Sequence, residues 1–110
     1  MSTSLRDSNA IYSNMSDDLD MAELIEEFVG CLSARATAIQ EAVQASNLAE
    51  VTRLAHQLKG AGGAYGFDEI TVVATELEAA CKAAQSVSQV EKEVAQLTDL
   101  CNRAKVRPAS

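Results

Sequence analysis

The sequence predicts an all-α protein, an antiparallel up-down-up-down four-helix bundle with a short N-terminal extension. Apolar residues make up 47% of the 110 residues but aromatic residues only 4%, and Trp is absent. A core of Ala, Leu, Val and Ile suits closely packed helices better than a sheet sandwich, which prefers β-branched and aromatic side chains. Apolar residues also recur at helical spacing in four segments joined by short loops, the pattern of antiparallel neighbours. A chain of this length holds one core and one domain.

The first segment combines a polar tail with a long helix. Residues 1–16 are rich in Ser and Asn, so we expect a tail with room for a short helix over residues 5–12. Ser16 is expected to cap the helix, because three Asp residues follow in its first turn and complement the helix dipole. The helix should end near Ser46. Its predicted apolar face comprises Met21, Ile25, Phe28, Leu32, Ala36, Ile39 and Val43.

The three later helices are predicted from apolar stripes within residues 51–62, 70–84 and 90–104. The second helix should fade near Gly66, and the last should end before Pro108, which cannot continue a helix. We therefore expect the bundle to span residues 17–107, followed by a tail of residues 108–110. The predicted helix starts are Asn47 with Glu50 as a capping box, Asp68, and Ser88 with Glu91 as a second capping box.

The charge balance excludes several kinds of partner. Nine basic and sixteen acidic residues give a net charge of −7, whereas nucleic-acid binding needs a basic stripe and anionic membranes attract basic segments. No apolar run approaches the roughly 20 residues of a membrane span. The N-terminus also lacks the apolar core of a secretory signal. We therefore expect a cytoplasmic protein that binds neither nucleic acid nor membrane.

The cysteines predict neither a disulfide framework nor a zinc site. Their number is odd, their spacing is wide and no CxxC pair occurs. We expect Cys31, Cys81 and Cys101 to be buried, reduced thiols.

The segment around the only His breaks the local rules of helix composition. Four of the five glycines fall between positions 60 and 66, although each Gly inside a helix costs about 0.8–1 kcal/mol relative to Ala. At about 100° per residue, His56 points away from the core stripe, and Lys59 and Gly60 share its face. Gly62 falls on the core stripe, which indicates a packing role. An exposed imidazole beside a cation and bare backbone leaves room for another molecule.

This arrangement suits phosphoryl transfer. A neutral imidazole is a nucleophile, and a nearby ammonium can hold phosphoryl oxygens. The sequence contains no phosphate-binding GxxxxGK[ST] loop and no dedicated magnesium cluster. The chain could accept and donate a phosphoryl group but could not take one from a nucleotide by itself. We therefore expect a phosphocarrier rather than an enzyme, with no cofactor of its own.

The stretch from Ala55 to Gly60, with Gly66 six residues on, resembles the signature of histidine-containing phosphotransfer (HPt) domains. These four-helix bundles relay phosphoryl groups between aspartates of response-regulator receiver domains. The resemblance implies that His56 is the phosphoacceptor through Nε2, that Lys59 steadies the phosphoryl group and that Gly60 clears the partner's approach. It also implies that the partners are receiver domains and a hybrid sensor kinase or its receiver, with Mg²⁺ bound by the receiver. We expect the protein to be a monomer.

The segment from His56 to Phe67 is also similar to the phosphorylated first domain of chemotaxis kinases. In that subset a Glu on the neighbouring helix orients the other ring nitrogen, and Glu78 occupies the matching position. Two alternatives stay open: a stand-alone or fragment substrate domain phosphorylated by an ATP-binding kinase domain, and a non-catalytic interaction bundle with an incidental His. The role of Gln57 is undecided between phosphoryl contact and solvated surface.

Overall fold

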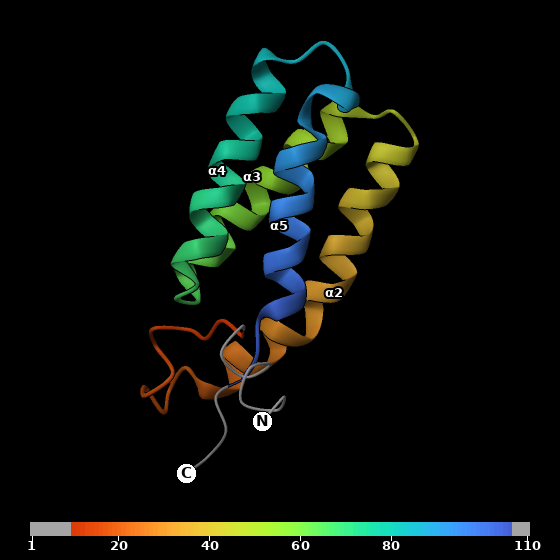
Figure 1. Ribbon diagram of the computed structural model, residues 1–110. Coiled ribbons are helices and arrows are strands. Elements are labelled where there is room, and N and C mark those ends of the chain that lie inside the picture. The colour runs from red at the N-terminus through yellow and green to blue at the C-terminus, as the bar shows by residue number, and fades with distance from the viewer. Residues whose placement is uncertain (1–9, 107–110) are drawn as a thin grey trace, which may run out of the picture.

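The computed structural model describes residues 10–106, and these residues form four α-helices packed side by side (Figure 1). The described part contains no strand, which confirms the all-α fold class. The connection between the first two helices lies at the same end of the molecule as residues 84–90, while residues 65–67 turn at the other end (Figure 1). The elements are α2 (Ala22–Gln44), α3 (Leu48–Ala64), α4 (Asp68–Ala83), the 3₁₀ helix η1 (Val87–Val90) and α5 (Glu91–Arg103).

The core is built from the apolar stripes of all four helices. Leu32, Ile39 and Leu77 are among the side chains with almost no exposed surface. Aromatic rings close one end, where Phe28 stacks on Tyr65 with ring centroids 4.6 Å apart and meets Phe67 at 5.7 Å. This core is mostly aliphatic, as the composition predicts. The expectation of three buried thiols is wrong at Cys31, which is exposed, whereas Cys81 and Cys101 are buried.

The start of α2 differs from the expectation that Ser16 caps it. The helix begins at Ala22, and no side chain bonds to its first turn. Ser16 instead donates its hydroxyl to the Ser13 carbonyl, and the Asp18 carboxylate accepts from the Asp20 N–H. Ser and Asp side chains stabilise turns as readily as helix starts, so these local bonds hold residues 14–21 in turns.

The other helix starts give a mixed outcome. Asn47 caps α3 by accepting a hydrogen bond from the Glu50 N–H, as predicted, although the Glu50 carboxylate pairs with Arg53 rather than reaching back. Asp68 is the first residue of α4 and Phe67 is its cap. Ser88 lies inside η1 and bonds to the Ser86 hydroxyl, so the predicted capping box at Ser88 with Glu91 is absent.

The early start of α4 follows from how α3 ends. Gly66 has φ +81°, a left-handed conformation that favours Gly. The N–H groups of Gly66 and Phe67 bond to the carbonyls of Gly63 and Gly62, which is a Schellman motif. The predicted helix stop at Gly66 is therefore confirmed. Because this turn is so short, Phe67 ends one helix and begins the next, leaving no room for Asp68 outside α4.

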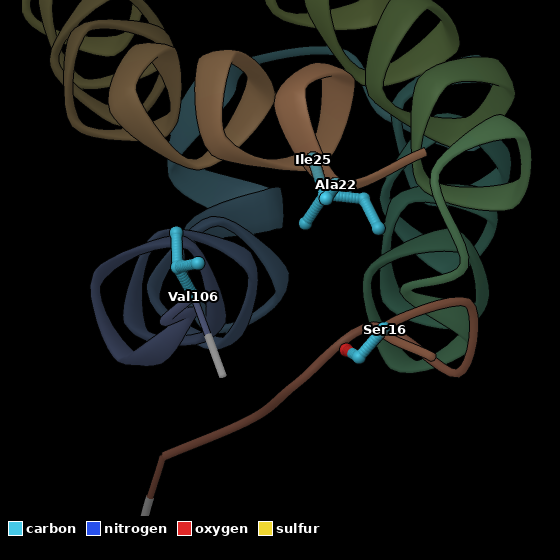
Figure 2. A pocket seen from close by; sticks show the side chains of 4 residues that line it. All are labelled: Ser16, Ala22, Ile25 and Val106. Atoms are coloured by element: carbon cyan, nitrogen blue, oxygen red, sulfur yellow. The ribbon is translucent and has the colours of Figure 1, made fainter. Parts of the chain in front are cut away.

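Residues 10–16 lie against the bundle, whereas residues 1–9 and 107–110 fall outside the described part. Of the short helix expected over residues 5–12, only residues 10–12 are described, and these are not helical. Ile11 is buried and exchanges backbone hydrogen bonds with Arg103 and Lys105. Asn14 donates its N–H to the Gly66 carbonyl. Beside this segment, a small hollow is lined by Ser16, Ala22, Ile25 and Val106 (Figure 2).

Candidate functional site

The apolar stripe of α3 sets the direction of His56. Val51, Ala55 and Leu58 are buried in the core, which turns the intervening His56 toward solvent. The His56 side chain is 67% exposed. The outward direction predicted from the helical period is therefore confirmed.

The structure brings three predicted site residues into contact across α3 and α4. Glu78 is buried on α4 and points at α3. One carboxylate oxygen, Oε2, lies 2.8 Å from Nδ1 of His56, and the other, Oε1, accepts a hydrogen bond of 2.6 Å from the Lys59 ammonium. The expected contact between Glu78 and the imidazole is therefore present.

The electrostatics of Glu78 fix the tautomer of the ring. The hydrogen bond from Lys59, followed by that from His56, lowers the pKa of Glu78 from 4.5 to about 2, against the opposing effect of desolvation. The carboxylate is therefore ionised at neutral pH and can only accept hydrogen bonds. Nδ1 of His56 must be the donor in this contact. In the neutral ring the lone pair then resides on Nε2, and within residues 10–106 His56 makes no other hydrogen bond.

Close packing of α3 on α4 lets Glu78 reach the ring. A methyl group built on Gly62 would lie 2.7 Å from the Thr71 hydroxyl and 3.1 Å from its backbone nitrogen. The same hydroxyl donates to the Lys59 carbonyl. Gly62 is thus a packing residue, as expected, and the small separation that it permits places the carboxylate of α4 beside the imidazole of α3.

Gly60 differs from Gly62 in having open space around it. A methyl group built on Gly60 would have no heavy atom within 4 Å, and the residue is exposed. The surface next to His56 is therefore bare backbone. Gln57 is also exposed, and its side chain has no hydrogen-bond partner in the described part of the chain.

Sequence reasoning missed one member of the cluster. Lys82 lies one turn after Glu78 on α4, and its ammonium is 3.8 Å from Oε2, the oxygen that faces His56. The signal was available in the sequence, because residues four apart share one face of a helix. It could be used only once Glu78 was known to point at His56.

Two further kinds of feature are absent from residues 10–106. No group of three or more His, Cys, Asp or Glu side chains there could hold a metal ion. None of the helices in this range has both the length and the apolar character needed to cross a membrane.

Comparison with known proteins gives one match, to the family model described as Hpt domain, over residues 23–106. The chain belongs to the Hpt domain family. The match covers nearly all of α2 and the whole of α3, α4 and α5, including His56 and Glu78. HPt domains are histidine phosphocarriers of phosphorelays and in general interact with response-regulator receiver domains. The searches of curated proteins and of solved structures found no match.

Proposed function

We propose that this HPt domain carries a phosphoryl group on His56 between the aspartates of two receiver domains. The supporting observation is the exposed imidazole whose Nδ1 is held by an ionised Glu78. This contact directs the lone pair of the neutral ring to Nε2, which makes the outer ring nitrogen the nucleophile. The antiparallel up-down-up-down topology belongs to the same proposal and is supported by the alternating ends of the connections (Figure 1).

The transfer step balances without a further reactant. The Nε2 lone pair attacks the phosphorus of an aspartyl phosphate. As the N–P bond forms, the P–O bond to the aspartate breaks, and its electron pair leaves with the carboxylate. The Nδ1 proton stays on the ring, and the Glu78 carboxylate balances the positive charge that the ring acquires. Attack by the aspartate of a second receiver reverses these bond changes and restores the neutral ring.

The remaining parts of the proposal concern the partner. Gly60 leaves the approach to His56 unobstructed, and Lys59 places a positive charge near His56 in a chain whose net charge is −7. The receiver, alone or as part of a hybrid sensor kinase, supplies the phosphoaspartate and binds Mg²⁺ in its own acidic pocket. The chain acts as a cytoplasmic monomer and releases each partner quickly, as a relay requires.

A phosphotransfer assay tests this proposal. Isolated receiver domains, labelled with radioactive acetyl phosphate and Mg²⁺, are mixed with the full chain and with a His56→Gln variant. We expect label on the wild type that is lost in acid and retained in base, and none on the variant. A wild-type chain that takes no label, or a variant labelled equally well, would overturn the proposal.

A second candidate donor is an ATP-dependent kinase domain. It is favoured by the hydrogen bond between Glu78 and Nδ1 of His56, because the phosphorylated first domain of chemotaxis kinases, which this chain resembles, orients its histidine with such a Glu. Incubation of the chain with such a kinase and ATP, in parallel with the receiver assay, separates the two donors. Labelling by the kinase alone would favour this candidate, while unchanged partner binding and pathway output in His56→Gln would favour an interaction bundle.

A further inference from the structure

The ammonium groups of Lys59 and Lys82 both face the Glu78 carboxylate, but they differ in distance from it and in exposure to solvent. Lys59 donates a 2.6 Å hydrogen bond to Oε1 of Glu78, and its side chain is 35% exposed. Lys82 lies 3.8 Å from Oε2, beyond hydrogen-bond distance, and its side chain is 68% exposed. Lys59 is therefore held in place, whereas Lys82 is free to move toward a new anion.

The charge of the cluster changes when the ring is phosphorylated. Before the reaction, two ammonium groups and one carboxylate leave one positive charge in excess. A fully ionised phosphoryl group adds two negative charges, and the ring that keeps its Nδ1 proton adds one positive charge. The phosphorylated cluster is then neutral. Without Lys82 it would carry a net negative charge, because Arg53 on the same face is already paired with Glu50.

Lys59 has less freedom than Lys82 to move toward a phosphoryl group, because it is already hydrogen-bonded to Glu78. Its hydrogen bond is the largest cause of the lowered pKa of Glu78. If its ammonium moved to the phosphoryl group, Oε1 of a buried carboxylate would lose its donor, and an acceptor left unsatisfied in this way costs stability even though Oε2 keeps the hydrogen bond from His56. Lys82 can leave Oε2 more easily, because that oxygen keeps the hydrogen bond from His56.

We propose, on the basis of the proposed function, that Lys82 is the cation that binds the phosphoryl group on His56, while Lys59 is a positioning residue that holds Glu78. Lys82 and Nδ1 of His56 both lie beside Oε2 of Glu78. The two contacts place the ammonium of Lys82 next to the carboxylate oxygen that the imidazole also contacts. The resemblance to HPt domains alone would have assigned the phosphoryl group to Lys59.

The single His of the chain makes the test direct. Phosphoramidate, a small donor that loses ammonia when the ring attacks its phosphorus, phosphorylates the full chain without a receiver. The ³¹P signal of phosphohistidine is then followed against pH in wild type, Lys82→Gln, Lys59→Gln and Lys92→Gln. Lys92 is an exposed lysine on α5 and supplies a control with the same change of charge. The ¹⁵N spectrum of the unphosphorylated ring reports its tautomer in each protein.

The two lysines should give opposite patterns. Loss of a neighbouring cation makes the last ionisation of the phosphoryl group harder, so Lys82→Gln should raise its pKa by about half a unit relative to Lys92→Gln. The ring tautomer should stay as in wild type. Lys59→Gln should instead mix the tautomers and move the phosphoryl pKa less than Lys82→Gln does.

A phosphoryl pKa in Lys82→Gln equal to that in Lys92→Gln would overturn the assignment. So would a larger shift in Lys59→Gln with an unchanged tautomer, since the two roles would then be reversed. Failure of the proposed function looks different, because a wild type that phosphoramidate labels but no receiver labels would lack the relay while still reporting on Lys82.

Discussion

At the scale of single residues, the buried carboxylate of Glu78 decides which ring nitrogen of His56 can react. His56 and Lys59 bond to different oxygens of Glu78, whereas a Glu78→Gln variant keeps an oxygen at only one of these two positions. Its NH₂ group can also donate to Nδ1 and stabilise the wrong tautomer. We expect transfer from a phosphorylated receiver to slow by about ten- to a hundredfold, as for other carboxylates that orient a reactive or ligating histidine.

The control for this variant is Glu76→Gln, an exposed position on the same helix. It should transfer at the wild-type rate and keep the wild-type ¹⁵N spectrum of the ring. Equal rates and equal spectra for the Glu78 and Glu76 variants would show that Glu78 does not act through the tautomer.

The same carboxylate predicts how stability depends on pH. Its pKa is lower in the folded protein, about 2 instead of 4.5, because Lys59 and His56 stabilise the ionised form. The stability that Glu78 contributes is therefore complete above about pH 4.5 and disappears as pH falls toward 2. Urea unfolding across this range should show the difference between wild type and Glu78→Gln shrinking as acid is added. A constant difference would contradict the lowered pKa.

Variants at Gly60 separate two effects of a side chain at this position: its effect on the access of a receiver to His56 and its effect on helix stability. Nothing lies within 4 Å of a methyl group at Gly60 or at Gly30, an exposed glycine of α2. Either Gly→Ala change should therefore raise the free energy of unfolding by about 0.8–1 kcal/mol in urea titrations. Gly60→Gln should slow labelling by a receiver but not by phosphoramidate, while Gly30→Gln should alter neither. If Gly60→Gln slowed labelling by both the receiver and phosphoramidate, the substitution would be acting on the reactivity of the imidazole and not on access of the receiver.

At the scale of elements, sequence periodicity located the helices but not their starts. The period of 3.6 residues reflects the burial of many apolar side chains along each helix. The apolar stripes of α2, α3, α4 and α5 and the outward direction of His56 could therefore be predicted. A cap depends on one side chain that has several competing partners. Ser16 and Asp18 bond within turns instead, and only Asn47 caps as predicted.

The end of α2 contains a strained residue that can be relieved. Ser46 has φ +56°, and the N–H groups of Ser46 and Asn47 bond to the carbonyls of Val43 and Ala42 in a Schellman motif. Gly adopts this conformation without the steric penalty of a Cβ atom. Ser46→Gly should raise the free energy of unfolding by about 0.5–1 kcal/mol, measured by urea titration.

A matched control is Ser33→Gly, which makes the same change at an exposed helical position of α2. There Gly should lower stability by about 0.5 kcal/mol. Two changes of the same sign would mean that the left-handed conformation at Ser46 carries no penalty.

At the scale of the whole molecule, the segment before α2 joins parts of the bundle that are distant in sequence. Ile11 pairs with the backbone after α5, and the Ser13 hydroxyl donates to the Tyr65 carbonyl at the turn between α3 and α4. Such pairing between distant segments leaves no local periodicity, so the sequence alone predicts a tail over this stretch. The Hpt domain match begins at residue 23, so this segment lies before the matched range. Neither of these contacts involves His56, Lys59 or Glu78.

The segment should therefore contribute to stability and not to the chemistry at His56. Ile11→Ala removes a side chain that is only 8% exposed, and we expect it to lower the free energy of unfolding by about 2–4 kcal/mol. Leu19→Ala, at a position that is 89% exposed, should change it by less than about 0.5 kcal/mol. Both variants should accept phosphate from phosphoramidate at the wild-type rate at 10 °C, a temperature at which both should remain folded. If Ile11→Ala proved as stable as Leu19→Ala, the packing of this segment against the bundle would contribute nothing to the fold; if it remained folded but reacted more slowly, the segment would instead affect the site.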